Sequence, residues 1–332
     1  MNVLLISPNF FNYPKEICSE LKKMGHKVDW FDDRPSTNSF VKAVIRINKS
    51  FISFYIKRYF KDMIKKIQNK KYDKVLIISG QSLSLSYEMI EELKIKQSQA
   101  EFILYQWDSL KNFPYIKTLK SLFNRCYSFD NNDVKLNEYL KFLPLFYTSL
   151  YENIGKEEKE NYRYDVMFVG TAHPKKYKYI SLMSKQLKEK FSKQYIYFFF
   201  PSKLVYIYRK LKNPEFKNAQ FSEFNFNSLN EKQMIDLLKN SKCVLDSAQD
   251  GQDGLTIRVL ETLGAKRKLI TTNKNVKDYD FYCPENIYIY NGQFDFNDIF
   301  FNSNYRNIDE KIYRKYSLNS WLKILLGENN EF

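Results

Sequence analysis

The sequence predicts an α/β protein made of two doubly wound parallel sheets in tandem, and three observations carry this prediction. Short apolar runs of strand length alternate with longer amphipathic segments along the 332-residue chain. A polar stretch, Tyr151 to Tyr164, interrupts this alternation and is a candidate linker. Between Lys242 and Asn273, an apolar strand, a loop with glycines, a helix and a second apolar strand follow one another, as in a crossover unit of a parallel sheet.

The individual elements follow from the same patterns. Strands of the first half are expected in the runs VLLIS (Val3 to Ser7), GHKVDWF, KVLIISG (Lys74 to Gly80), EFILYQWD (Glu101 to Asp108), RCYSFD (Arg125 to Asp130) and KFLPLFY (Lys141 to Tyr147). Helices are expected over Pro14 to Met24, Ser39 to Asn69 and Tyr87 to Lys94. The strands expected in the second half are YDVMFVGT, YIYFFF, FSEFNF, KCVLDS, KLITTN and NIYIY, followed by a helical segment from Ile308 to Leu326. Strands that alternate with helices favour parallel pairing.

The composition is strongly basic and argues for an anionic partner. Lys and Arg number 53 against 38 Asp and Glu, which gives a formal net charge of +15. Such a surface suits nucleic acid, an anionic membrane or phosphorylated substrates, and charge alone does not choose among them. The usual nucleic-acid signatures are missing from the sequence, so we expect no nucleic-acid partner.

Cysteine and histidine usage argues against a metal centre. The four cysteines are scattered without a CxxC pair, and only His26 and His173 are present. Cys126 and Cys243 lie in apolar runs and are expected to be buried free thiols. The N-terminal letters lack the pattern of a signal peptide, and no run reaches the ~18 apolar residues of a membrane span. We therefore expect a cytoplasmic protein.

The crossover unit carries more polar groups than a packing helix needs. Its loop, AQDGQDG, contains two glycines, and the helix LTIRVLETLGA is expected to end with Gly264 as C-cap. Asp253 and Glu261 are eight positions apart. On a helix they would be separated by about 80° and a rise of roughly 12 Å. This offset would let the two acids contact opposite ends of one elongated ligand. The alternative is an ordinary α/β unit in which both acids are solvated.

This spacing resembles the acid–seven residues–acid motif of GT-B glycosyltransferases, and the phrase from the Gln/Asp-rich loop to LITTN is similar to CgeB-like and other bacterial surface-polysaccharide (capsule or lipopolysaccharide) glycosyltransferases. The resemblance is specific mainly from about Tyr164 to Tyr290. It implies that Asp253, where the family more often has Glu, binds the donor sugar and that Glu261 binds the ribose. It also places the loop residues Gln249, Gly254, Leu255 and Thr256 in the donor site. It implies an acceptor domain at 1–155, a donor domain at 163–306, and helices at 307–332 that pack back on the first domain.

A second loop is expected at the donor phosphates. In VGTAHPKKYKYI a strand ends at Gly170 and Thr171, and two lysines, Lys175 and Lys176, precede a helix. Backbone amides and ammonium groups in this arrangement suit a diphosphate. His173 lies in the same loop and is a candidate hydrogen-bond partner of the donor. The loop lacks GxGxxG, so it is no dinucleotide fingerprint, and solvated lysines in an ordinary loop are the alternative.

Arg258 is the other candidate phosphate contact. Its alternative role is a salt bridge to Glu261, three positions along the helix.

Two carboxylates are candidates for the base that would deprotonate an acceptor hydroxyl. Asp108 and Asp130 each follow an expected strand of the first domain. Asp108 is the first choice, because its phrase QWDS is similar to one that recurs in the family. Either residue is equally suited to cap the helix that follows it. A retaining enzyme would need neither as a base, so the stereochemical course stays open.

The segment from Ser39 to Asn69 combines an apolar stripe with a basic face. Core packing explains the stripe, while the basic face suits an anionic membrane surface. The run from Tyr195 to Lys212 has a similar mixture of aromatic and basic residues. A peripheral contact with the inner face of the plasma membrane is therefore one candidate.

The function expected from the sequence is transfer of a sugar from a nucleotide-sugar to a hydroxyl of a surface polysaccharide or lipid-linked glycan. We expect no cofactor and no metal, because basic groups and amides would stabilise the leaving diphosphate. The alternatives are a nucleotide-sugar epimerase or hydrolase on the same fold, or a non-catalytic component of a polysaccharide-assembly complex.

Overall fold

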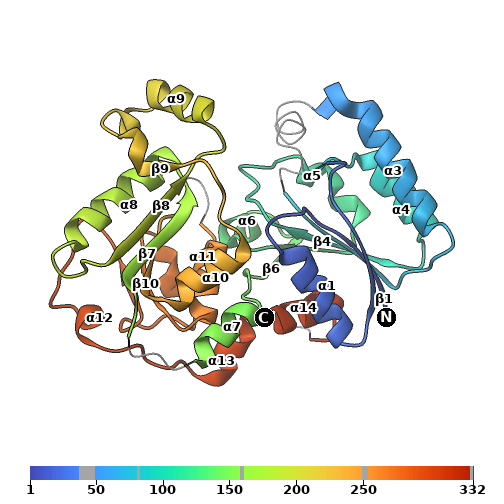
Figure 1. Ribbon diagram of the computed structural model, residues 1–332. Coiled ribbons are helices and arrows are strands. Elements are labelled where there is room, and N and C mark those ends of the chain that lie inside the picture. The colour runs from blue at the N-terminus through green and yellow to red at the C-terminus, as the bar shows by residue number, and fades with distance from the viewer. Residues whose placement is uncertain (37–48, 81–82, 158–160, 249–252, 330–331) are drawn as a thin grey trace. The chain divides into compact units, whose positions relative to one another are not determined.

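The structure is a computed structural model, and it describes residues 1–36, 49–80, 83–157, 161–248, 253–329 and 332. The chain divides into two compact units. The first consists of Met1–Pro144 together with Leu318–Phe332, and the second of Leu145–Ser317. Each unit is built around its own six-stranded parallel sheet (Figure 1). The predicted fold class, two Rossmann-like doubly wound units in tandem, is confirmed.

The first unit has the strand order β2-β1-β3-β4-β5-β6, with every neighbouring pair parallel. Its strands are β1 (Asn2–Ile6), β2 (Lys27–Phe31), β3 (Lys74–Ser79), β4 (Glu101–Gln106), β5 (Arg125–Ser128) and β6 (Leu140–Phe142). Its helices are α1 (Tyr13–Lys23), α3 (Ser53–Ile67), α4 (Tyr87–Lys96), α5 (Ile116–Leu119), α6 (Asn131–Lys135) and α14 (Leu318–Leu326).

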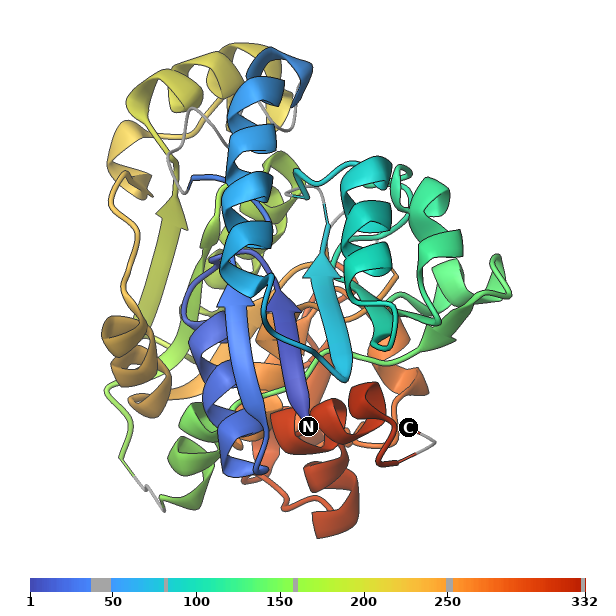
Figure 2. The same ribbon diagram turned by 90° about the vertical axis from the view of Figure 1, so that its right-hand side faces the viewer.

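Helices cover both faces of this sheet. On one face α3 and α4 contribute Phe60, Met63 and Leu93 to a core that includes the inner side chains of β3 and β4. On the other face α14 packs beside α1 (Figures 1 and 2). There the rings of Trp321 and Tyr105 meet edge to face, with centroids 4.7 Å apart. The last helix of the chain therefore completes the first unit.

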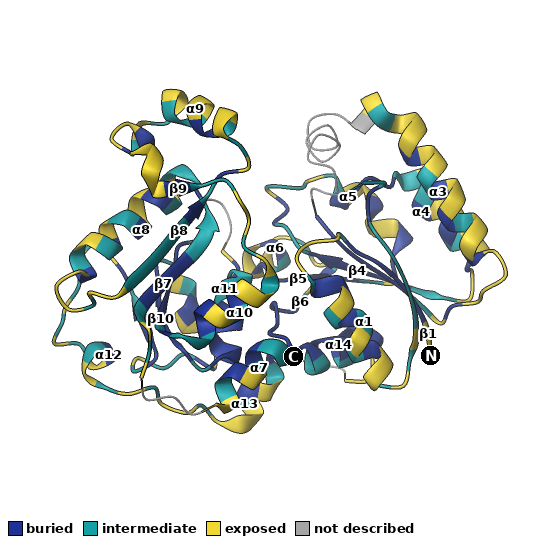
Figure 3. Cartoon of the chain, viewed as in Figure 1, coloured by how far each residue is buried: buried dark blue, intermediate teal, exposed yellow. Residues whose placement is uncertain are grey.

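The second unit has the order β12-β11-β10-β7-β8-β9, again with parallel neighbours. Its strands are β7 (Tyr164–Thr171), β8 (Gln194–Phe199), β9 (Phe224–Asn225), β10 (Ser241–Asp246), β11 (Lys268–Thr271) and β12 (Ile287–Ile289). Its helices are α7 (Ser149–Lys156), α8 (Pro174–Leu187), α9 (Lys203–Lys212), α10 (Glu231–Lys239), α11 (Ile257–Gly264), α12 (Ile299–Asn302) and α13 (Glu310–Lys315). The middle strands are buried on both faces, as their unbroken apolar runs require (Figure 3).

The expected linker from Tyr151 to Tyr164 is partly helical instead. Helix α7 occupies its first residues, and Tyr151 and Ile154 are buried on one side of that helix. Apolar side chains three positions apart within a short polar run produced this face, which the polar composition obscured. Because α7 packs against α11, the division between the units falls at Pro144, before the expected boundary at residue 155.

Helix α11 begins later than expected. Its first residue is Ile257, so Asp253 lies in the preceding loop and not on the helix. The angular offset calculated for Asp253 and Glu261 on a continuous helix therefore does not apply. The C-cap is Ala265, and the residue with a left-handed backbone is Lys266, at a φ of 51°. The prediction of Gly264 as C-cap is wrong.

Gly264 is instead required by packing. A Cβ at this position would lie 2.6 Å from Cγ of Tyr147, and one at Gly155 would lie 2.5 Å from the carbonyl oxygen of Gly264. Real Cβ atoms do not approach other atoms so closely, so glycine at these two positions lets α7 and its flanking chain lie directly on α11.

The long helix expected from Ser39 to Asn69 is seen only in part. Residues 37–48 lie outside the described residues, and α3 covers the second half of the prediction. Ile56, Phe60 and Met63 of its apolar stripe are buried in the first unit, as expected for core packing, whereas Phe51 and Tyr55 are exposed.

Two expectations drawn from composition can be compared with the structure. Cys126 and Cys243 are buried free thiols, as predicted, and burial raises the pKa of each to about 12. No helix within the described parts of the chain combines the length and the apolar character that crossing a bilayer demands.

Substitution of Gly264 by Ala tests the contact between α7 and α11. Alanine in place of glycine usually stabilises a helix by about 1 kcal/mol. Here we expect the free energy of unfolding to fall by about 1–3 kcal/mol, because the methyl group would overlap Tyr147. Urea denaturation measures the change, and a stabilised variant would contradict this packing.

Candidate functional site

The order of strands in the second unit locates a candidate site. From β7 the chain proceeds to β8 and β9 on one side of the sheet, and β10, β11 and β12 lie on the other. The connections therefore reverse direction between β7 and β10. In open α/β sheets ligands bind at the carboxyl ends of the strands beside such a reversal. Two residues separate the end of β7 from the start of α8, and ten residues separate the end of β10 from the start of α11.

Both helix N-termini at this position lack a capping side chain. Neither His173, the N-cap of α8, nor Thr256, the N-cap of α11, makes a side-chain hydrogen bond to its own first turn. The hydroxyl of Thr256 donates to Asp246 Oδ1 instead, at 3.0 Å. The first amides of a helix have no partner within the helix, and the helix dipole is positive there. These two N-termini are therefore suited to an anionic ligand.

Asp246, the last residue of β10, lies at the centre of the polar groups. Its second carboxylate oxygen accepts a 3.0 Å hydrogen bond from the hydroxyl of Thr271. The ammonium group of Lys176, in the first turn of α8, is close enough to Asp246 and Arg258 for both to act on it. Burial lowers the pKa of Lys176, Asp246 opposes this change, and Arg258 adds to it. Two of the predicted phosphate contacts, Lys176 and Arg258, are thus brought together from separate segments.

Glu261 is buried and has a partner on each carboxylate oxygen. Arg258 Nη1 lies 2.7 Å from Oε2, and the hydroxyl of Tyr151 donates to Oε1 at 2.6 Å. The salt bridge considered for Arg258 is therefore formed, and the guanidinium is near enough to Lys176 to lower the pKa of that lysine. Each carboxylate oxygen can accept more than one hydrogen bond. A carboxylate held in this way is of the type that accepts hydrogen bonds from sugar hydroxyls.

His173 is held in one orientation by Arg209 of α9. Arg209 Nη1 lies 3.2 Å from Nδ1 of the imidazole and also donates to the carbonyl of Ala172. Because arginine only donates, Nδ1 is the acceptor, and in the neutral ring the proton lies on Nε2. Burial, Arg209 and Lys176 together lower the pKa of His173 to about 4. At neutral pH the ring is thus an uncharged donor through Nε2.

The remaining predicted donor residues lie around this cluster or apart from it. Lys175 is exposed, and Gly170 and Thr171 end β7 in half-buried positions. Gly254 and Leu255 are buried, whereas Asp253 is exposed.

The backbone of Asp253 is anchored from the far side of the loop. Its carbonyl oxygen accepts a hydrogen bond from Asn275 Nδ2 at 3.1 Å, and a longer one from Asn273. Gln249 lies outside the described residues.

In the first unit, Asp108 lies at the carboxyl end of the sheet as expected. It follows β4, and a Cβ on Gly80, just after β3, would overlap its carboxylate. The glycine therefore makes room for Asp108 to reach across the end of the neighbouring strand. The side chain is half-buried, so one part of it faces solvent.

Asp130 performs the structural role considered for it. Its carboxylate accepts hydrogen bonds from the backbone amides of Asn132, at 3.0 Å, and Asp133, at 3.3 Å, and so caps α6. Asp130 is also buried.

Three residues of the cluster were not predicted. Asp246 could have been found from the sequence, because it ends the apolar run KCVLD, and ligands of such sheets bind at the ends of the strands. No short sequence pattern marks Tyr151 or Arg209, because each reaches the cluster from a helix far away in the sequence.

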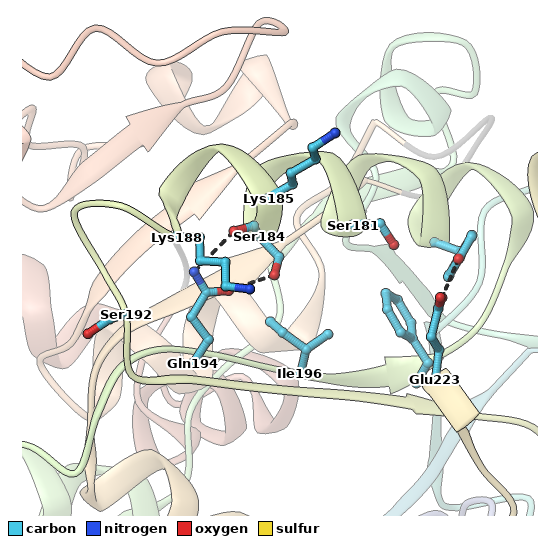
Figure 4. A pocket seen from close by; sticks show the side chains of 10 residues that line it. Ser181, Ser184, Lys185, Lys188, Ser192, Gln194, Ile196 and Glu223 are labelled. Carbon is cyan, nitrogen blue, oxygen red and sulfur yellow. Dashed lines mark hydrogen bonds between the residues drawn. The ribbon is translucent and has the colours of Figure 1, made fainter. Parts of the chain in front are cut away.

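A cavity of about 570 Å³ lies elsewhere in the second unit, along α8 and β8 (Figure 4). It is lined by Tyr177, Ser181, Ser184, Lys185, Lys188, Ser192, Gln194, Ile196, Phe198 and Glu223. The lining includes none of the candidate residues that the structure describes. Hydrogen bonds join its lining residues: Tyr177 donates to Glu223, the hydroxyl of Ser184 donates to Gln194, and Gln194 Nε2 donates to the carbonyl oxygen of Ser184. The cavity is therefore distinct from the candidate donor site.

Within the described ranges, no three His, Cys, Asp or Glu side chains form a group that could hold a metal ion.

Comparison with known proteins gives matches in structure but none in sequence. No protein-family model matches the chain. No curated protein sequence matches it either.

Solved structures are similar over the whole chain. HepE from Anabaena, in complex with UDP and glucose, has a TM-score of 0.59 at 9% identity, with 99% of this chain and 100% of that chain covered. The lipopolysaccharide outer core galactosyltransferase WaaB, in its apo form, has a TM-score of 0.52 at 10% identity, with 99% of each chain covered. The UDP-GlcNAc 2-epimerase from Methanocaldococcus jannaschii has a TM-score of 0.50 at 11% identity, with 98% and 100% covered. At these identities the likeness shows the fold, which is that of the GT-B glycosyltransferases.

The low pKa of His173 can be measured directly, because the chain has only two histidines. We expect His173 to titrate near pH 4 by NMR, well below the ordinary 6.5. Because the unfolded chain would bind this proton first, stability is full above pH 6.5 and falls as the pH drops towards 4. Arg209→Met should raise the pKa, since it removes a nearby positive charge.

The matched control is Lys212→Met, which removes an exposed charge from the same helix. The pKa of His173 should not change in this variant. An equal shift in both variants would mean that general surface charge, and not the Arg209 contact, sets the pKa. The substitution His26→Asn assigns the two signals.

Proposed function

We propose that the protein is a glycosyltransferase that moves a sugar from a nucleotide-sugar donor to a hydroxyl acceptor. The observation that carries this proposal is the meeting of Lys176, Arg258 and Glu261 beside two uncapped helix N-termini at the strand reversal of the second sheet. The GT-B fold agrees with it, and HepE, which shares that fold, is described in complex with UDP and glucose.

The proposed donor site neutralises a diphosphate with fixed positive groups. Lys176 and Arg258 supply full charges, and the first amides of α8 and α11 supply partial ones. Lys175, exposed beside them, adds a third cation, and Gly170 and Thr171 form the strand end below. Charge that develops on the leaving diphosphate would be stabilised by these groups, so the proposed reaction uses no metal ion and no cofactor.

The proposal extends to the rest of the donor. We propose that Glu261, which Tyr151 and Arg258 hold in place, accepts hydrogen bonds from the ribose hydroxyls. His173 would donate from Nε2 to a donor oxygen. The loop residues Asp253 and Gln249 would orient the sugar.

Gly254, Leu255 and Thr256 connect that loop to α11 and would set its approach to the donor. Gly254 is held by Asn273, which donates to its carbonyl oxygen at 3.4 Å.

The proposed acceptor is a surface polysaccharide or a lipid-linked glycan, assembled in the cytoplasm at the inner face of the membrane. Support comes from the resemblance of the 245–273 segment to surface-polysaccharide enzymes and from WaaB, which is described as a lipopolysaccharide outer core galactosyltransferase. We propose Asp108 as the base for an inverting reaction, because it is half-buried at the end of β4. Asp130 is the second candidate.

A second candidate function is supported by one comparison. UDP-GlcNAc 2-epimerase shares the fold. An epimerase or a hydrolase would change or release the sugar without an acceptor, so product analysis with and without a glycan acceptor separates these activities from transfer.

The nucleotide site can be tested with a panel of UDP, GDP, CMP, ADP and dTDP. A nucleotide present at a hundredfold excess over its Kd should stabilise the protein by about 2.7 kcal/mol, seen as a rise in Tm. For the nucleotide that binds, Lys176→Met should weaken affinity by about tenfold to a hundredfold, because a charge-assisted hydrogen bond to phosphate is lost.

Lys178→Met is the control, since Lys178 is exposed on the same helix. It should bind the nucleotide as the wild type does. The nucleoside without phosphates should bind both variants equally. If no nucleotide raises Tm, the proposed activity fails, and a non-catalytic role in an assembly complex becomes the better explanation.

Substitution by Asn separates the two candidate bases. Asp108→Asn should lower kcat by about 10²–10⁴-fold while donor affinity is kept. Asp130→Asn preserves the cap of α6, because asparagine caps helices as well as aspartate does. We expect it to keep activity. If the two results are exchanged, Asp130 is the base and Asp108 is not.

A further inference from the structure

Helix α9 has one face inside the second unit and one face in solvent. The inner face carries Tyr206, which is buried, and Arg209, which reaches the loop after β7. The outer face carries large apolar side chains with high exposed fractions (Figure 3). These are Leu204 at 78%, Ile207 at 51%, Tyr208 at 57% and Leu211 at 82%. Their spacing of three, four and seven positions places them in one stripe along the helix.

Basic side chains border this outer stripe, here defined as Leu204, Ile207, Tyr208 and Leu211. At 100° per residue, Lys203 and Lys212 lie about 90° to either side of its middle. The ten residues of α9, KLVYIYRKLK, include no acid. Lys203 lies over the ring of Phe221, which is itself 49% exposed and extends the apolar surface.

The lysines on both sides of the outer stripe indicate which kind of partner covers it. A lipid bilayer with anionic headgroups offers an apolar layer to the stripe and negative charge to the lysines, whose long side chains reach outwards while their stems stay on apolar surface. A second copy of the chain would set these lysines against their own counterparts, because a twofold contact pairs identical patches. The ten-residue helix is about 15 Å long, which suits a helix lying in the interface and is too short to span a bilayer.

We propose that α9 docks the protein on an anionic lipid bilayer, with the outer stripe buried among the headgroups. This goes beyond the proposed reaction, since it rests on the outer face of α9 and not on the residues of the donor site. It narrows the membrane contact expected from sequence, which included residues 39–69 and the run from Tyr195 to Lys212, to the outer face of one helix.

The test is co-sedimentation of the full chain with vesicles of phosphatidylcholine alone or mixed with phosphatidylglycerol. The wild type should bind the anionic vesicles and lose affinity as salt is added. The double variant Leu204→Glu/Leu211→Glu should bind at least tenfold more weakly. Because both side chains are exposed, its Tm should be unchanged. Lys203→Glu/Lys212→Glu should also weaken binding, by about fivefold or more for each lysine.

The matched control is Ile95→Glu, which places the same charge on a residue of α4 that is 72% exposed. It should bind vesicles as the wild type does. Equal binding by the wild type and the double Leu variant would overturn the proposal. Analytical ultracentrifugation gives a second test. If the wild type is a dimer, and the double Leu variant is a monomer that still binds vesicles, the stripe is a contact between two copies of the chain and the proposal is wrong. Neither result bears on the nucleotide panel, which tests the donor site.

Discussion

The buried carboxylate of Glu261 is the interaction on which the second unit most depends. A charge at this depth is tolerated because Arg258 neutralises it and Tyr151 donates to its other oxygen. The hydroxyl of Tyr151 ties α7 to α11, and glycines at the crossing let the two helices touch. Removal of Arg258 would leave the buried charge of Glu261 without its counter-charge, which costs several kcal/mol. The same salt bridge holds the guanidinium of Arg258 close to Lys176, so stability and the candidate site share one set of contacts.

The positive groups of the site act on one another even without a ligand. His173 is uncharged at neutral pH because burial, Arg209 and Lys176 all disfavour a proton on it. The pKa of Lys176 is lowered by burial, and Arg258 adds to that change. An anion that entered the cluster would reverse part of both effects, since it would favour the charged forms. The site is therefore suited to a negatively charged ligand, which would add to the stabilisation that Asp246 and Glu261 give to Lys176 and Arg258.

Sequence reasoning reached the fold and much of the second unit because both leave local signals. Buried parallel strands appear as continuous apolar runs, and the basic loop after β7 and the polar helix α11 are visible in short windows. It failed where a long-range contact decides the outcome. The polar segment that contains α7 looks like a linker until α11 covers its two apolar residues. The start of α11 at Ile257 and the backbone anchoring of Asp253 by Asn275 depend on the fold around the loop. Tyr151 and Arg209 join the cluster from distant helices, and no short pattern marks them.

Arg209 belongs to the same helix that carries the outer stripe. From the inner face of α9 it bonds to the carbonyl of Ala172 and lies beside His173, in the loop proposed for the donor phosphates. A bilayer that fixes α9 would thereby also fix the position of that guanidinium. If donor binding and lipid binding favour the same position of the helix, each must strengthen the other by an equal factor, since such coupling is reciprocal. The single helix would then make the protein a better binder of its donor at the membrane than in free solution.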